Sequence, residues 1–534
     1  MIYWAMSTKT YRPWAPSQAY LLPPSPRDWL PEDHLAYFIL DVVCESLDLS
    51  PIEAKMRAKD PRGNKPYAPQ MMLALLIYAY CTGVFSSRKI ERATYDHVGF
   101  RVIAGGLHPD HVCISEFRRV NLAEFEALFV QTVRLCRELG MLKLGMFALD
   151  GTKVKADASK HKAMSYAHMI KVEARLEEEI AELLERAELV DQAEDEVYGE
   201  RGYEDLPAEL HRREERLRRI REAKTALERG AREARASELD EQAERHEANA
   251  ADESRTETDR RRSATLGRKR REKAAELREA NANANDDDDD DEQDDGGLPF
   301  TDRPAADGDS QPDSESPDGP DGPQMPSHRV RHTADGEPHP SAQANFTDSE
   351  SQIMEHQGGF IQGYNCQAVC DESGVMVAQG VTNVAPDTHH LPPMMGAAEE
   401  NLDQKIEEAA ADTGYWAPEN AAYCEENGID AYIATSRKPT RKADAESGTD
   451  SSGSDPPQRP VDQMRAKTST PEGAEKYRKR KWIAEPPFGN IKENQGFRQF
   501  SLRGLDKVRG EWSLVTAAHN LRKAWIFTRR AAMV

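Results

Sequence analysis

A long polar stretch separates the apolar parts of this 534-residue chain and so limits which segments can share a core. From about residue 231 to 345 the regularly spaced apolar residues disappear, and Asp alone occupies positions 286–291. Such a composition cannot bury enough apolar surface to offset the entropy lost on ordering. We therefore predict that 231–345 is a disordered charged insertion. A second stretch rich in Ser, Pro and Asp, 439–463, is predicted to be a disordered linker.

The net charge of −23 would by itself argue against binding to nucleic acid. Residues 281–325, however, contain 16 acidic residues and one Arg, which leaves a charge of only −8 for the rest of the chain. Basic tracts at 260–273 and 476–482 lie outside this acidic region. Local charge is therefore the better guide to partners. The tract 260–273 is either a solvated arm or a surface for non-specific contact with phosphates.

Apolar periodicity predicts two helical regions before the polar stretch. Residues 1–30, rich in Pro and aromatic residues, are expected to form an extended arm, and 31–140 an all-helical domain of short helices. Heptad-like apolar runs in 166–230, interrupted at 198–207, predict an inserted antiparallel helical hairpin. The longest apolar run, 71–80, is too short to span a bilayer, so we expect a cytoplasmic protein with no membrane partner.

Strand-like runs occur on both sides of the insertion, in 141–165 and 346–534. After the first strand come a two-stranded hairpin at about 360–383, a helix at about 390–408, and a short apolar strand that ends on Asp412. A helix, a fifth strand and further helices follow. This order predicts an α/β mixed fold, with a five-stranded mixed sheet flanked by helices.

Acidic residues follow two of these strands. The run "GMFALD" ends on Asp150 and the run "AAAD" ends on Asp412, and side chains at adjacent strand ends meet at one edge of a sheet. Two buried carboxylates repel each other unless a cation lies between them, and Mg²⁺ is the natural cation for oxygen ligands. Glu485, on a later helix with Lys481 and Lys492 on the same side, could supply a third carboxylate. Carboxylates for two metal ions and bases for phosphate suit phosphodiester chemistry.

The chain closely resembles the insertion-sequence DDE transposases, and most closely the eleven-eighty-two type with its helical insertion. An N-terminal block carries part of the resemblance, "PYAPQMMLALLIYAYCTGVFSSRKIERATYDHVGFRVIAGGLHPDHVCISEFRR". Further blocks follow in family order: "FALDGTKVKADASKHKAMSY", "NFTDSESQIM", "GFIQGYNCQAVCD", "TNVAPDTHHL", "ADTGYW" and "YRKRKWIAEPPFGNIKENQGFRQFSLRGL". Together these blocks cover most of the chain outside the two polar stretches.

The resemblance implies an RNase H-like catalytic core, split between 141–165 and 346–534. Its catalytic acids map to Asp150, Asp412 and Glu485, which would hold two Mg²⁺ ions, with Mn²⁺ as a substitute. The family's helix signature is Tyr-x2-Arg-x3-Glu-x6-Lys. Glu485 and Lys492 match its second half, and Tyr477 and Arg480 match its first, but Arg480 lies one residue too far from Glu485 and Lys481 holds the expected place. Either base could therefore contact phosphate.

Other charged residues admit more than one interpretation. Five basic residues of the helical domain are either plain scaffold or face the terminal inverted repeats in a helix-turn-helix-like manner: Arg88, Lys89, Arg92, Arg118 and Arg119. Three further acids compete with the triad: Asp157, Asp348 and Asp387. Asp387 precedes a predicted helix, where a capping role is expected.

The resemblance implies a nucleoid-associated transposase that acts as a homodimer on double-stranded DNA. It would bind the terminal inverted repeats of its own element, hydrolyse a phosphodiester at each end, and join the freed 3′ ends to target DNA. Two alternatives are a catalytically inactive or domesticated DNA-binding protein and an RNase H-like nuclease without strand transfer.

Overall fold

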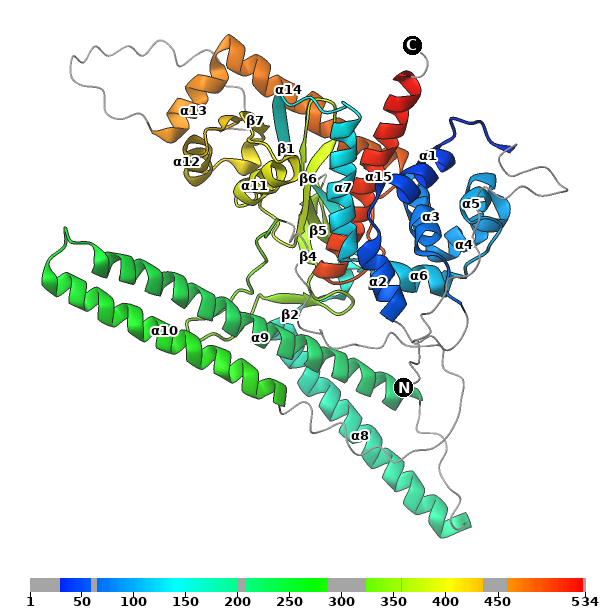
Figure 1. Cartoon of the computed structure of the whole chain (residues 1–534). Coiled ribbons are helices and arrows are strands. Elements are labelled where there is room, and N and C mark those ends of the chain that lie inside the picture. The colour runs from blue at the N-terminus through cyan, green and yellow to red at the C-terminus, as the bar shows by residue number, and fades with distance from the viewer. Residues whose placement is uncertain are drawn as a thin grey trace, which may run out of the picture. The chain divides into compact units, whose positions relative to one another are not determined.

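The computed structural model describes residues 29–58, 65–198, 208–286, 323–356, 358–435 and 459–531 (Figure 1). Two compact units make up the chain. The first contains Met1–Asp157, Ser316–Ser327 and Ile353–Val534, and the second contains Ala158–Glu315 and His328–Gln352. Nearly all of the predicted arm, 1–30, and most of the predicted linker, 439–463, lie outside the described residues.

A six-stranded mixed sheet forms the centre of the first unit. In space the order is β4–β5–β1–β7–β8, and β6 also pairs with β5. The strands are β1 (Met146–Lys155), β4 (Gln352–His356), β5 (Gly359–Cys370), β6 (Met376–Thr382), β7 (Glu408–Ala411) and β8 (Asp430–Ile433). β1 is antiparallel to β5 and parallel to β7, and β7 is parallel to β8. The prediction of a mixed sheet is confirmed. The predicted number of strands was one too low, because β4 is short and its sequence, QIMEH, is half polar.

Helices surround this sheet. They are α1 (Leu35–Asp41), α2 (Ser50–Ala58), α3 (Pro69–Cys81), α4 (Ser87–Asp96), α5 (Val98–Ile103), α6 (His111–Val120), α7 (Glu124–Glu138), α11 (Leu391–Leu402), α12 (Pro418–Glu426), α13 (Pro460–Ser469), α14 (Pro471–Gly489) and α15 (Leu505–Ala531). α13 begins inside the predicted linker 439–463, so the last residues of that segment are helical.

The two faces of the sheet carry different helices. Gln379 of β6 donates from Nε2 to Ser513 Oγ of α15, at 3.0 Å. At the next residue, Gly380, an added Cβ would lie 3.1 Å from Met394 Sδ of α11. Since successive residues of a strand point to opposite faces, α15 covers one face and α11 the other. Figure 1 shows α7 beside α15, on the α15 face.

The N-terminal helices share a core with the sheet. α3 is apolar around its whole circumference, and its residues from Met71 to Cys81 are all buried. A helix of this kind needs neighbours on every side, and α1, α5 and α15 supply them. The helical region predicted at 31–140 is therefore present as helices, but it belongs to the same compact unit as the sheet.

Three long helices dominate the second unit: α8 (Tyr166–Tyr198), α9 (Ala208–Ala251) and α10 (Glu257–Asp286). It also contains a two-stranded sheet of β2 (Ala163–Ser165) and β3 (Gln343–Asn345). α8 and α9 are antiparallel, because Glu179 pairs with Arg213 whereas Glu173 pairs with Lys224. Their shared core includes Met169, Leu176 and Leu217. The segment 199–207, which would join them as a hairpin, lies outside the described residues.

The predicted disorder of 231–345 is wrong for residues 231–286, which belong to α9 and α10, and for Gln343–Asn345, which form β3. Small side chains replace the missing large ones along the contact between these helices: Ala236 and Ala274 are buried together with Leu239. An added Cβ at Gly267 would lie 3.3 Å from the carbonyl oxygen of Ala243. Ala, Glu, Arg and Lys are also strong helix formers, so little apolar surface is needed. Residues 287–322 lie outside the described part of the chain.

Candidate active site

Two of the predicted acids lie at the junction of adjacent parallel strands. The parallel pairing of β1 with β7 ends at Leu149 and Ala411, and the next residues are Asp150 and Asp412. β7 ends there, as predicted, but β1 continues to Lys155 because its backbone remains paired with β5. The prediction that the first strand stops on Asp150 is therefore wrong. The two acids are nevertheless close enough for the charge of Asp412 to act on Asp150.

Burial and like charge raise the pKa of Asp150. Desolvation is the largest cause, and it raises the pKa to about 6. The positive charge of Arg480 opposes this shift, while the nearby carboxylates of Asp412 and Asp387 add to it. Asp150 Oδ1 also accepts a hydrogen bond from the backbone N–H of Gly151, at 2.9 Å. The site thus holds more negative charge than its protein cations balance.

Arg480 is the cation in direct contact with this site. It projects from α14, is only 8 % exposed, and its Nη1 lies 3.1 Å from Asp150 Oδ2. A buried guanidinium that is paired in this way is not presented to solvent. In this conformation Arg480 pairs with Asp150 and is not available for the phosphate contact that was one of the two alternatives predicted, the other being Lys481.

Glu485 lies on the same helix as Arg480 and is exposed. The negative charges of Asp150, Asp412 and Glu485 each act to raise the pKa of Arg480. Within the described parts of the chain, no three His, Cys, Asp or Glu side chains are gathered closely enough to hold a metal ion. The structure therefore brings Asp150 and Asp412 together, and it places Glu485 on a neighbouring helix without completing a three-carboxylate group.

A fourth acid, Asp387, is more deeply involved in this region than the sequence indicated. Its Oδ1 accepts hydrogen bonds from Lys153 Nζ at 3.1 Å, Asn365 Nδ2 at 2.7 Å and Gln367 Nε2 at 2.9 Å. Burial opposes ionisation of Asp387, but the His390 ring, the Lys153 ammonium and the Asn365 amide hold its pKa below the usual range. The predicted capping role is wrong, because α11 begins after His390 with no side-chain cap.

Two glycines allow the polar groups to approach one another. A Cβ at Gly414 would lie 3.0 Å from Asp412 Oδ1 and 3.2 Å from Asp387 Oδ2, so these two carboxylates flank the same glycine. A Cβ at Gly151 would lie 2.3 Å from Gln367 Nε2, so the Gln367 amide would have to move from its present position. Replacement of either glycine would therefore push apart groups that the site holds in contact.

The remaining residues of the predicted helix signature point in different directions. Lys492 is half-buried, and its Nζ donates to the carbonyl oxygen of Lys153 at 3.0 Å, so it faces β1. Tyr477 is half-buried and Lys481 is exposed. Trp482, the residue after Lys481, is 77 % exposed. The sequence pattern did not predict this exposure. An indole this exposed, on a basic helix face that also carries Glu485, is a ready platform for stacking.

The basic residues of the N-terminal helices also divide into two groups. Arg88, Lys89, Arg92 and Arg119 are exposed, and Arg119 makes two hydrogen bonds of 3.0 Å to Glu116. Arg118 is only 5 % exposed and donates from Nη1 to Tyr80 Oη, Phe85 O and Ser501 Oγ. The structure thus corrects the prediction for Arg118, which is an internal cation and does not face a ligand. DNA contact by the exposed four stays a prediction.

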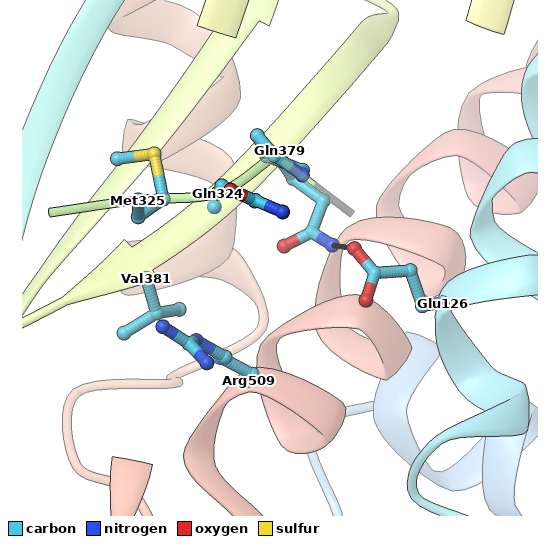
Figure 2. Close-up of a pocket in the computed structure, with 8 residues that line it drawn as sticks. Glu126, Gln324, Met325, Gln379, Val381 and Arg509 are labelled. Atoms are coloured by element: carbon cyan, nitrogen blue, oxygen red, sulfur yellow. Dashed lines mark hydrogen bonds between the residues drawn. The ribbon is translucent and has the colours of Figure 1, made fainter. Parts of the chain in front are cut away.

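Figure 2 shows a separate pocket in the first unit. It has a volume of about 390 Å³, and Glu126 of α7, Gln379 and Val381 of β6, Arg509 of α15 and Met325 line it. Figure 2 shows Glu126 and Gln379 joined by a hydrogen bond. None of Asp150, Asp412 and Glu485 is among its lining residues, so we do not assign the chemistry to this pocket.

Two family models match the chain, one at each end. The first, described as Transposase domain (DUF772), matches residues 24–120, and the second, described as Transposase DDE domain, matches residues 446–525. The second match contains Arg480, Glu485 and Lys492. No curated protein and no solved structure gives a significant match. The two matches support an insertion-sequence DDE transposase.

Transposases act on DNA, so the two matches support DNA as the partner of this chain and DNA transposition as its function. The first match covers the helices with Arg88, Lys89, Arg92, Arg118 and Arg119. Neither match distinguishes the eleven-eighty-two type, which stays a prediction. Among the described residues, no helix combines the length and apolar character that crossing a bilayer requires.

Proposed function

We propose that this transposase binds the terminal inverted repeats of its own insertion sequence, cleaves a phosphodiester at each end, and joins the freed 3′ ends to target DNA. The observation that carries the proposal is the adjacency of Asp150 and Asp412 at the end of the β1–β7 pairing. Glu485 on α14 is the third acid of the proposal, and the split sheet of 141–165 and 346–534 is its RNase H-like core.

The side chains of these acids are chemically suited to bind a hard divalent cation. Their ligand atoms are carboxylate oxygens, which Mg²⁺ and Mn²⁺ prefer. The pKa of Asp150, raised to about 6, shows that burial and neighbouring acids leave a negative charge that a cation would stabilise. In the proposal Asp150, Asp412 and Glu485 would hold two such ions, and the bound ions would supply Lewis acidity for phosphodiester cleavage.

The protein's own side chains orient these acids. Arg480 holds Asp150 from the α14 side, and Gly151 N–H fixes its other oxygen. On the other side, Asp387 binds Lys153, Asn365 and Gln367 in one buried network. Gln367 in turn accepts a hydrogen bond from Tyr415, which follows Asp412 closely in the chain. This network fixes the strand ends, so that cleavage needs little reorganisation of the protein.

The exposed face of α14 is the proposed contact with the DNA near the site. Arg478, Lys481 and Trp482 are exposed there, close in sequence to Glu485. Cations on this face would bind phosphates, and the indole would stack on a base or a sugar. Lys481 therefore fits the phosphate role better than Arg480, which is buried against Asp150.

The test uses the purified full chain, a labelled duplex that carries the element's inverted repeat, and Mg²⁺. Alanine at Asp150, Asp412 or Glu485 is expected to abolish end cleavage and to leave duplex binding intact. Full cleavage by the Asp412→Ala protein would refute the assignment. Pre-cleaved ends supplied with target DNA then separate a transposase from a nuclease without strand transfer, because only the former yields joined product.

A further inference from the structure

The arginines and lysines of α10 in the second unit are unevenly neutralised. The run 260–273 contains eight basic residues and a single acid, Glu272. Some of these cations make ion pairs within the helix or across to α9, and others make none. Cations that pair with acids of α9 hold the two helices together, whereas cations without such a partner remain available to a ligand.

The paired cations lie on two sides of the helix. Across the contact with α9, Arg271 pairs with Glu247 at 2.7 Å, and Arg278 with Asp240 at 2.8 Å. These pairs neutralise the acids that α9 presents to α10. Within α10, Arg261 pairs with Glu257 at 2.6 Å, and Arg268 with Glu272 at 3.6 Å. The last two pairs are exposed and contribute little to stability, but they offset the arginine charges locally.

Three further cations are exposed and follow helical spacing: Arg262, Lys269 and Lys273. In the described part of the chain, none of the three lies within 4.0 Å of a carboxylate oxygen. Steps of seven and four residues place them on one side of the helix, about 16 Å from first to last. Asp259 and Glu276 bound this row at its two ends, and no acid lies on its face between them.

A row of unpaired cations on a rigid helix has a preferred partner chemistry. It matches a regular line of negative charges, and duplex DNA carries one charge for about every 1.7 Å of its axis. Small acidic ligands would need a concave site, whereas a convex helix face suits a long polyanion. The helical order of 231–286 also means that these cations are held in register, which a solvated arm would not provide.

We infer that the α10 face formed by Arg262, Lys269 and Lys273 binds the sugar–phosphate backbone of duplex DNA without reading its sequence. The inference rests on the proposed function, since that function supplies the DNA. It goes beyond that function by assigning a second DNA-binding surface, in the inserted helical unit, to residues that the catalytic steps do not use.

The test measures binding of the full chain to a labelled duplex of arbitrary sequence over a range of NaCl concentrations, with EDTA present to prevent cleavage. The test variant is Arg262→Gln/Lys269→Gln/Lys273→Gln. Its matched control is Arg245→Gln/Arg261→Gln/Arg268→Gln, which removes the same formal charge from exposed arginines that each pair with a Glu four residues away. Circular dichroism and thermal melting establish that both variants fold.

Each phosphate contact contributes about 0.9 to the slope of log K against log salt, so the test variant should lower that slope by about 2 to 3. The control should lower it by less than half as much. Equal effects of the two variants on the slope, or no effect of the test variant, would overturn the inference. The inference would also be overturned if the test variant lost binding to anionic vesicles while its salt slope for DNA stayed unchanged. If the inference fails in one of these ways but the wild-type chain still binds DNA and cleaves its ends, the proposed function still stands.

Discussion

Arg480 Nη1 lies 3.1 Å from Asp150 Oδ2, so the first acid of the proposed triad is paired with a cation from the helix that carries the third. A guanidinium in this position stabilises the carboxylate in the absence of metal, and it competes with any divalent ion for the same oxygen. If a divalent ion binds to this oxygen as proposed, Arg480 would have to move away from it.

Replacing Arg480 by Gln should tighten metal binding to the DNA-free protein. Loss of the competing charge favours a divalent ion beside Asp150, and we expect about a three- to tenfold lower dissociation constant for Mn²⁺. Isothermal titration calorimetry without DNA measures this. Lys481→Gln is the control, since Lys481 is exposed and should leave the affinity within about twofold. Weaker Mn²⁺ binding by the Arg480 variant would contradict the competition.

Asp387 offers a test of the polar network beneath the acids. Asp387→Asn removes the charge that Lys153, Asn365 and Gln367 share, and it leaves a largely buried ammonium without its partner. The free energy of unfolding should fall by about 2–4 kcal/mol. Asp430→Asn is the control, because the Asp430–Lys467 pair is more exposed and should cost less than about 1 kcal/mol. Denaturant titration compares them, and equal losses would show that the network adds nothing.

The sequence predicts one strand end at the site and not the other, for a physical reason. The acid after β7 could be predicted because a short apolar run ends on Asp412. The end of β1 is misplaced because Thr152 to Lys155 stay in the sheet through backbone pairing with β5, and Val154 is the one apolar residue among these four. The hydrogen-bond network of Asp387 could not be predicted, since its partners come from β1 and β5, on other elements of the sheet.

The helices of the insertion show a different limit of prediction from sequence. Disorder was expected for 231–286 because large apolar residues are missing, yet α9 and α10 pack through Ala236, Ala274 and Gly267. Small residues permit close helix contact, and cross-helix ion pairs such as Arg271–Glu247 add to it. Periodicity of large apolar residues does not detect a contact of this kind.

Arg118 and Arg119 are adjacent in sequence but should behave in opposite ways. Arg118→Met leaves Tyr80 and Ser501 without a buried donor, so the melting temperature should fall while the salt dependence of DNA binding stays unchanged. Arg119→Gln should leave the melting temperature within about 1–2 °C, since Arg119 is exposed. If Arg119 faces DNA, the salt slope should fall by about 1. A variant of Arg118 with native stability would contradict its internal role.

His519 should make the fold sensitive to mild acid. Complete burial lowers the pKa of this histidine to about 4, against weak opposition from the carbonyl oxygen of Gly374. The folded state thus binds fewer protons than the unfolded state between pH 6.5 and about 4, so stability falls as the pH falls through that range. The loss amounts to about 3 kcal/mol at most.

His519→Gln provides the comparison, because a Gln amide can also donate to Gly374 O and accept from Asn490 Nδ2. The variant should be less stable than the wild type at pH 7.5, and the gap should narrow toward pH 4.5. Denaturant titrations at a series of pH values measure this gap. A constant difference between the two proteins would exclude His519 as the source.

The most direct test of the account concerns Asp412 and metal specificity. A thiolate at this position binds Mg²⁺ poorly and softer divalent ions better. The full-length Asp412→Cys protein is incubated with a duplex that carries the element's end, and cleavage is measured in Mg²⁺ and in Mn²⁺. We predict that Mg²⁺-supported cleavage falls at least about 100-fold and that Mn²⁺ restores a substantial part of it. Cleavage in Mg²⁺ at the wild-type rate would contradict a role for Asp412 as a metal ligand.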